Sequence, residues 1–173
     1  MSIKSKEKKP KDIKQSIKEW GLSFIFAFIL VQILKVFIIS FAVVEGPSME
    51  NTIQNGDRVV VLKFLEPKKG DVVVVENSKG SKLIKRVIGT EGDKIEIKDG
   101  ELFLNGKKQK ESYIKEPMTK NNFNEVTVPK GEIFVMGDNR NISADSRYYG
   151  TFDIKQHYIG RVVMEYIDDL KFY

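Results

Sequence analysis

A continuous apolar stretch runs from residue 20 to residue 44, after a polar N-terminal tail. A membrane-spanning helix needs about 20 consecutive apolar residues, and Trp20 stands at one end, where an interfacial aromatic side chain is expected. Gln32 and Lys35 interrupt the stretch, but Lys35 lies toward its far end, where a long side chain can reach outward. The pattern therefore predicts a transmembrane anchor over residues 20–44.

A cleaved secretory signal is the alternative interpretation of this stretch. Such a signal has an apolar core of about 7–15 residues and ends at a small-x-small cleavage site. The apolar stretch is longer than that, and Ala42-Val43-Val44 is a poor cleavage site. We therefore favour an anchor that stays in the mature protein.

Beyond residue 44 the apolar positions follow the pattern of β-strands. Residues 58–62 and 71–75 are rich in valine, and residues 94–98 alternate between charged and apolar side chains. Strands at short spacing, separated by Gly, Asn and Pro turns, predict an antiparallel all-β domain over residues 45–173. Further strands are expected at residues 101–104, 125–128, 132–136 and 158–166, hairpin turns at Asp99-Gly100 and Asn105-Gly106, and a loop-rich stretch at 107–124.

The positive charge of the chain is concentrated in residues 1–19. This basic tail holds seven lysines and three acidic residues, whereas nucleic-acid-binding proteins spread Lys and Arg over a folded face. Nucleic acid is therefore not an expected partner. Lysines beside an apolar span stay on the cytoplasmic side, so residues 45–173 are expected outside the cell membrane.

The chain has no cysteine and one histidine, His157. These counts exclude a disulfide framework, a thiolate nucleophile and a cysteine-based or histidine-rich metal site. No acidic partner for His157 can be identified, so this histidine is expected at a surface or interface. No cofactor or metal is expected.

The first candidate for chemistry is the tetrapeptide Gly46-Pro47-Ser48-Met49. Gly46 permits unusual backbone angles and Pro47 restricts φ, so that a turn can expose Ser48 together with neighbouring N–H groups. This arrangement suits a nucleophile beside an oxyanion hole. Taken alone, the tetrapeptide favours a plain turn beside the membrane.

The second candidate is Lys85, because a strand through residues 82–89 would place it on one face with Leu83 and Val87. One interpretation is an edge-strand lysine that prevents aggregation. The other is a buried amine, whose pKa burial can lower from about 10.4 toward the range of about 7–8 that a general base needs.

The third candidate is the polar stretch of residues 136–147, which directly follows an apolar strand. Asp145 and Arg147 could pair and hold the loop, and the Ser143 hydroxyl could orient an amine. A generic polar loop is the alternative for this stretch on its own.

In this order, and after an N-terminal anchor, the three segments resemble those of the type I signal peptidases, in particular the short bacterial form with a single anchor. The resemblance covers nearly the whole chain from the anchor onward. It rests on the segments GPSMENTI (46–53), GDRVVV (56–61), KRVIG (85–89) with Gly92-Asp93, and GDNRNISADSRYYG (137–150).

The resemblance implies a role for each candidate residue. Ser48 would be the nucleophile of a serine protease, and Lys85 would be the general base that takes its proton. The Ser48 N–H, with help from around Gly46, would hold the oxyanion. The remaining implied roles are a hydrogen bond from Ser143 to the Lys85 amine, bracing of the Ser143 loop by Asp145 and Arg147, and substrate contacts at Met49 and Ile84.

The family also implies an antiparallel β catalytic domain with a small inserted β lobe, here at about residues 94–128. Its substrates would be the signal peptides of exported preproteins, bound in extended form with small residues before the cut. Two departures stand out, since the family commonly has Pro-Thr-Leu at Asn51-Thr52-Ile53 and Asp-Asn at Asn141-Ile142. They bear on rate and preference, because neither changes Ser48, Lys85 or Ser143.

Three alternatives compete with an active signal peptidase. An inactive relative would bind signal peptides without cutting them, although both Ser48 and Lys85 are present here. A self-cleaving Ser–Lys repressor would carry a helix-turn-helix domain instead of an apolar span. A Ser–His peptidase would have histidine in place of Lys85. The oligomeric state stays open.

Overall fold

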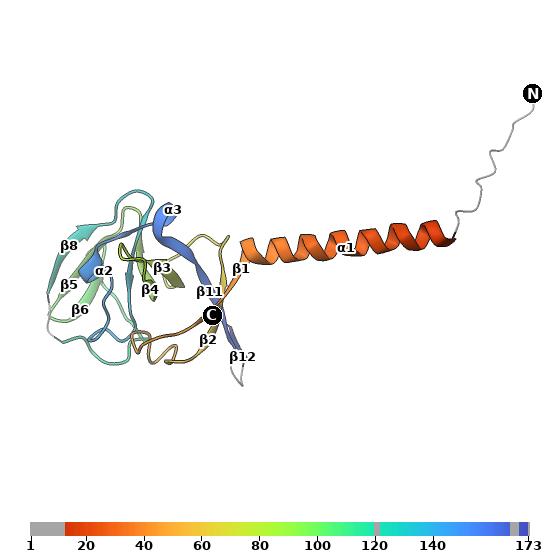
Figure 1. Ribbon diagram of the computed structural model, residues 1–173. Coiled ribbons are helices and arrows are strands. Elements are labelled where there is room, and N and C mark those ends of the chain that lie inside the picture. Colours follow the sequence, from red (N-terminus) through yellow and green to blue (C-terminus); the bar gives the residue numbers. More distant parts are fainter. Residues whose placement is uncertain (1–12, 120–121, 167–169, 173) are drawn as a thin grey trace, which may run out of the picture. The chain divides into compact units, whose positions relative to one another are not determined.

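The computed structural model describes residues 13–119, 122–166 and 170–172, in two compact units that divide between Phe37 and Ile38 (Figure 1). The first unit contains helix α1 (Ile13–Ile38) except for its last residue, and the exposed large apolar side chains of this helix include Trp20, Phe24 and Phe28. Within the described ranges, no helix combines the length and the apolar character that a membrane crossing requires.

The predicted anchor differs from the structure at its C-terminal end, because residues 39–43 form a strand rather than helix. This strand, β1 (Ile39–Val43), pairs in antiparallel register with β2 (Arg58–Leu62). Phe41 and Val43 are exposed, whereas Ala42 packs against a core cluster. The sequence Ile-Ser-Phe-Ala-Val suits a pleated, half-buried surface as well as an apolar helix, so the pattern alone could not separate the two.

The second unit confirms the prediction of an antiparallel all-β fold. Its larger sheet has the strand order β1-β2-β11-β3-β4-β9-β10, with β12 paired to β11. The strands expected at residues 58–62, 132–136 and 158–166 have those bounds, and the strand expected at 71–75 begins one residue later. The bounds not yet given are β3 (Val72–Glu76), β4 (Lys82–Thr90), β9 (Glu132–Met136), β10 (Phe152–Asp153), β11 (Tyr158–Tyr166) and β12 (Leu170–Phe172).

A smaller sheet lies in the chain between β4 and β9, within the range expected for an inserted lobe. Its order is β7-β6-β5-β8, with all pairs antiparallel. It belongs to the same compact unit as the larger sheet. Its strands are β5 (Lys94–Lys98), β6 (Glu101–Leu104), β7 (Lys107–Lys108) and β8 (Phe123–Thr127).

The larger sheet is covered by apolar clusters on both faces. In β3, Val72 and Val74 belong to one cluster, whereas Val73 and Val75 belong to another. Burying a valine side chain contributes roughly 1.5–3 kcal/mol, which is why this central strand is an unbroken apolar run.

A third cluster joins the two sheets, with Ile95 and Ile97 of β5 packed near Phe134 and Met136 of β9. Gly89 permits this close approach, since a Cβ there would come within 2.7 Å of the Ile95 Cδ1 atom. The small sheet therefore packs against the C-terminal end of β9, which leads into the polar stretch of residues 136–147.

Candidate active site

The turn that carries Ser48 is held between buried apolar residues. Val44 precedes it, and Met49 and Ile53 follow it, all three in the same core cluster. Gly46 has φ +91°, a region that favours glycine, and its N–H donates to Asn55 Oδ1 at 2.8 Å. Ser48 itself is only half-buried, so its hydroxyl is accessible from a cleft.

Lys85 lies in β4, where it pairs with Val73 of β3, and the pairing of β4 with β9 on the other side begins at the next residue, Arg86. Its neighbours on the same face, Leu83 and Val87, belong to an apolar cluster, and Lys85 is 3% exposed. This burial rules out the interpretation of Lys85 as a solvent-exposed lysine that protects a sheet edge. The Lys85 Nζ atom donates to Ser48 Oγ at 2.8 Å and to the Ile84 carbonyl at 2.9 Å.

Burial lowers the pKa of Lys85 to about 8, from an ordinary value of 10.5. Removal of the ammonium from water is the main cause, and the negative charges of Asp145 and Asp138 partly oppose it. A substantial fraction of the amine is therefore neutral near pH 8, within hydrogen-bonding reach of the Ser48 hydroxyl.

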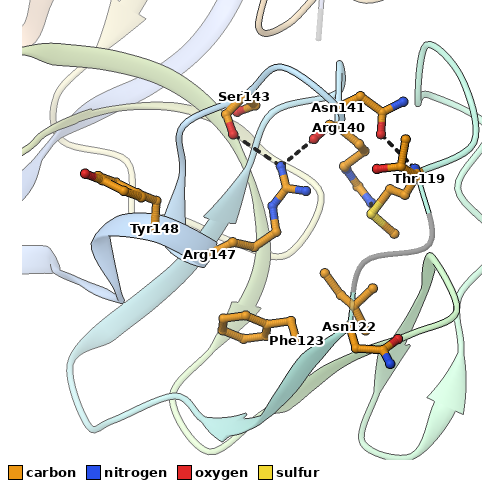
Figure 2. Close-up of a pocket in the computed structure, with 10 residues that line it drawn as sticks. Thr119, Asn122, Phe123, Arg140, Asn141, Ser143, Arg147 and Tyr148 are labelled. Carbon is orange, nitrogen blue, oxygen red and sulfur yellow. Dashed lines mark hydrogen bonds between the residues drawn. The ribbon is translucent and has the colours of Figure 1, made fainter.

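The loop that contains Ser143 is braced by the pair expected from the sequence. Asp145 is fully buried and caps helix α2 (Ser146–Tyr149). It accepts hydrogen bonds from Arg147 Nε at 2.9 Å, from Arg147 Nη2 at 2.8 Å and from the Gly137 N–H at 3.0 Å. Arg147 Nη2 also donates to the Arg140 carbonyl at 2.7 Å and the Ser143 carbonyl at 3.4 Å (Figure 2).

The expected hydrogen bond between Ser143 and the Lys85 amine is not formed. The Ser143 Oγ atom is buried and has no hydrogen-bond partner among the described residues. It packs against Gly137, where a Cβ would come within 2.6 Å of the Ser143 Cβ and 2.5 Å of the Ser48 carbonyl oxygen. The hydroxyl is thus beside the backbone of the nucleophile turn, while Lys85 is bound to Ser48 and Ile84 instead.

Ser48 and Lys85 open into a cleft of about 620 Å³. Ile84 lines this cleft, as expected for a substrate contact. The expectation for Met49 is wrong, because its side chain is 1% exposed and fills the core beneath the turn. The other wall of the cleft includes Ile142 and Ala144.

Comparison with known proteins agrees with this geometry. The family model described as "Signal peptidase, peptidase S26" matches residues 17–167. The chain belongs to this signal peptidase family. A signal peptidase I of Bacillus licheniformis is 37% identical over 155 residues, covering 82% of this chain and 83% of the relative. Signal peptidase IB of Staphylococcus aureus (strain COL) is 36% identical over 171 residues, covering 87% and 89%.

A crystal structure of a signal peptidase I from Enterococcus faecalis V583 aligns with a TM-score of 0.48 at 29% identity, covering 56% of this chain and 97% of that chain. The relatives are named as peptidases, so the alternative of an inactive signal-peptide-binding protein has no support among them.

Sequence reasoning on this signal peptidase missed the groups that hold the nucleophile turn. The Asn139 N–H donates to the Ser48 carbonyl at 3.0 Å, and Asn139 Nδ2 donates to the Pro47 carbonyl at 3.2 Å. Asp138 forms a bidentate pair with Arg86, at 2.8 and 2.6 Å, and accepts from the Thr52 hydroxyl. The run of polar residues directly after β9 could have indicated these groups, but only Ser143, Asp145 and Arg147 in that run were assigned roles.

A second missed group comes from the stretch predicted to be loop-rich. Arg140, which is 1% exposed, makes two hydrogen bonds of 2.6 Å to Glu111. The Tyr113 ring lies 4.3 Å from the Arg86 guanidinium carbon and 5.8 Å from that of Arg140. These contacts join the small sheet's segment to the segment that supports Ser48.

The lowered pKa of Lys85 makes a prediction about pH. Only the neutral amine can accept the Ser48 proton, so kcat/KM is expected to rise about tenfold per pH unit below the pKa and to level off above about pH 8. A profile of initial rates between about pH 6 and about pH 10 measures this. A plateau that is already reached below about pH 6.5 would contradict the assignment.

Proposed function

We propose that the chain is a serine endopeptidase that removes signal peptides from exported preproteins, with Ser48 as nucleophile and Lys85 as general base. The observation that carries the proposal is the 2.8 Å contact between Ser48 Oγ and a buried Lys85 amine. Ordinary lysines carry a proton at neutral pH. Burial of the Lys85 amine destabilises its charged form, so the neutral form is available to accept the proton of the half-exposed Ser48 hydroxyl.

In the first step, the neutral Lys85 amine takes the Ser48 proton while Oγ attacks the scissile carbonyl carbon. The carbonyl oxygen becomes an oxyanion, which the Ser48 N–H stabilises. Pro47 has no N–H and that of Gly46 is bound by Asn55, so Ser48 supplies the donor that this turn can offer. Gly46 contributes through its backbone angle.

In the second step, the tetrahedral intermediate collapses, the peptide C–N bond breaks and Lys85 gives its proton to the leaving amine. The signal peptide is then esterified to Ser48. A water molecule, deprotonated by Lys85, attacks this ester, and its second collapse releases the carboxylate and returns the proton to Ser48. Rotation of the buried Ser143 hydroxyl toward the amine would hold Lys85 in line during these transfers.

The substrate binds as an added strand along β4. Residues 82–86 pair with β3, whereas pairing with β9 begins only at Arg86, so the other edge of Lys82, Leu83 and Ile84 is open. An extended peptide can bond to this edge, with Ile142 and Ala144 on its far side. Ile84, Ile142 and Ala144 give this part of the cleft an apolar lining, and we expect it to accept small side chains before the cut.

The N-terminal segment holds the protein at the cytoplasmic membrane, with the β domain on the outer side. The support is the apolar run at residues 20–44, the exposed apolar side chains on α1 and the basic tail before them. Signal peptides and membrane lipid are therefore the proposed partners.

One experiment tests both parts of the proposal. The full chain is produced in cells, and carbonate-washed membranes are incubated with a purified preprotein. The wild-type protein is expected in the membrane pellet and is expected to cut the preprotein once. The Ser48→Ala variant should pellet equally and leave the preprotein intact. Cleavage that persists in Ser48→Ala would overturn the catalytic assignment, and wild-type protein in the supernatant would overturn the membrane assignment.

A further inference from the structure

Residues 141–144 form a wall between two cavities. Ile142 and Ala144 line the cleft that contains Ser48. Asn141 and Ser143 line a second cavity, of about 400 Å³, on the side of the small sheet (Figure 2). Any movement of this wall therefore changes the width of the substrate cleft.

Asn141 ties the wall to the segment before β8 through three hydrogen bonds. Its Oδ1 atom accepts from the Thr119 N–H at 2.8 Å, as the dashed line in Figure 2 shows. Its Nδ2 atom donates to Glu116 Oε1 at 3.0 Å and to the Pro117 carbonyl at 3.2 Å. The Oδ1 atom acts as an acceptor and the Nδ2 atom as a donor, so a side chain with only acceptors or only donors would lose at least one of these hydrogen bonds.

The segment that Asn141 binds, residues 116–119, is held in place by contacts with the rest of the domain. The Lys115 N–H donates to the Asp138 carbonyl at 3.1 Å, and Met118 packs against the cluster between the two sheets. The backbone of Met118 lies so close to Gly100 that a Cβ on the glycine would come within 2.6 Å of the Met118 carbonyl oxygen. Asn141 thus connects the segment of residues 116–119 to the wall of the cleft.

We propose that Asn141 is a positioning residue, whose amide sets the substrate-binding width of the cleft by fixing Ile142 and Ala144. The inference rests on the proposed function. The amide, at a position where the family commonly has aspartate, matches its partners in this chain because Glu116 and the Pro117 carbonyl are both acceptors. A carboxylate at position 141 would lose both donated hydrogen bonds and would place a second negative charge about 3 Å from Glu116.

The test is a double-substitution cycle in the full chain, read as separate kcat and KM values for a preprotein peptide. Asn141→Asp is expected to raise KM about tenfold and to change kcat less than about twofold, because Asn141 touches neither Ser48 nor Lys85, and Arg147 holds the Ser143 carbonyl and Asp145 independently of Asn141. Adding Glu116→Gln supplies a new donor to Asp at position 141 and removes a charge, so the double variant should return KM to within about threefold of wild type.

Two matched controls separate positioning from a general charge effect. Asn124→Asp adds the same charge on exposed β8, and it should leave KM unchanged. Glu125→Gln removes a surface charge of the small sheet, and it should not rescue Asn141→Asp. Hydrogen exchange of a peptide covering residues 141–150 should rise in Asn141→Asp and fall again in the double variant.

The outcomes are distinct. If the wild-type protein cleaves and Asn141→Asp keeps the wild-type KM, or if Glu116→Gln fails to rescue it, the positioning role is wrong while the proposed function stands. If the wild-type protein does not cleave at all, the proposed function is wrong, and the role of Asn141 in substrate binding falls with it.

Discussion

Replacement of Lys85 by methionine is expected to lower kcat/KM at about pH 8 by at least about 10³-fold. General-base assistance contributes about 10²–10⁴-fold, and a base and nucleophile that act as a unit lose nearly all activity when either is removed. Methionine keeps the length of the buried side chain, so the strand and its apolar surroundings should be preserved. Single-turnover cleavage of a preprotein peptide measures the effect.

The same replacement should stabilise the fold at neutral pH. The pKa of Lys85 in the folded protein, about 8, lies below its ordinary value of 10.5, so protonation costs about 3 kcal/mol of stability below pH 8, and this penalty disappears as pH rises to 10.5. The hydrogen bonds lost at Ser48 Oγ and at the Ile84 carbonyl offset about 1 kcal/mol each. Lys85→Met is therefore expected to gain about 1 kcal/mol at pH 7, measured by urea unfolding.

Lys130→Met is the matched control, because Lys130 is exposed in the turn before β9 and lies outside the cleft. It should change neither activity nor stability by a measurable amount. A Lys85→Met variant that keeps more than about a tenth of wild-type turnover would remove Lys85 from the role of base. A variant that is both inactive and unfolded would instead show that the amine is needed for folding.

Asp145→Asn is expected to destabilise the protein by about 3 kcal/mol. Breaking a buried ion pair by removing one charge costs about 3–5 kcal/mol, and the partial exposure of Arg147 favours the lower end. The asparagine also brings an N–H₂ group among donors from Arg147 and Gly137. Urea unfolding at pH 7 gives the free-energy difference.

The substitution should also shift the pH profile of any remaining activity to lower pH, because the charge of Asp145 raises the pKa of Lys85. Asp153→Asn is the matched control. Asp153 caps α3 (Ile154–His157) through the N–H groups of Lys155 and Gln156 and has no arginine partner in the described part of the chain, and asparagine caps equally well. If Asp145→Asn costs no more than Asp153→Asn, the ion pair does not brace the loop.

Local patterns in the sequence predicted most of the domain. Asp99-Gly100 and Asn105-Gly106 have positive φ at all four residues, as the turns of tight hairpins require. The strand at residues 39–43 was assigned to the anchor. Its five apolar and small residues continue the apolar pattern of the helix, and no glycine or proline separates the two elements. Its pairing with β2 depends on residues 15 or more positions away, which a local pattern does not contain.

The candidate site was predictable where one residue type stood out against its surroundings. Lys85 on an apolar face and Ser48 after Gly-Pro met that condition. The pair of Glu111 and Arg140 did not, because the two residues are 29 positions apart and each resembles an ordinary surface charge. Met49 was expected to contact the substrate, whereas its side chain lies in the core.

The contacts of Glu111 and Tyr113 with Arg140 and Arg86 make the segment that connects β7 and β8 of the small sheet a structural partner of the nucleophile turn. Local opening of that sheet would release the support under Ser48 even with every strand of the larger sheet intact. Peptide-bond cleavage by this protein is in that sense a cooperative property, available only while both sheets are folded together.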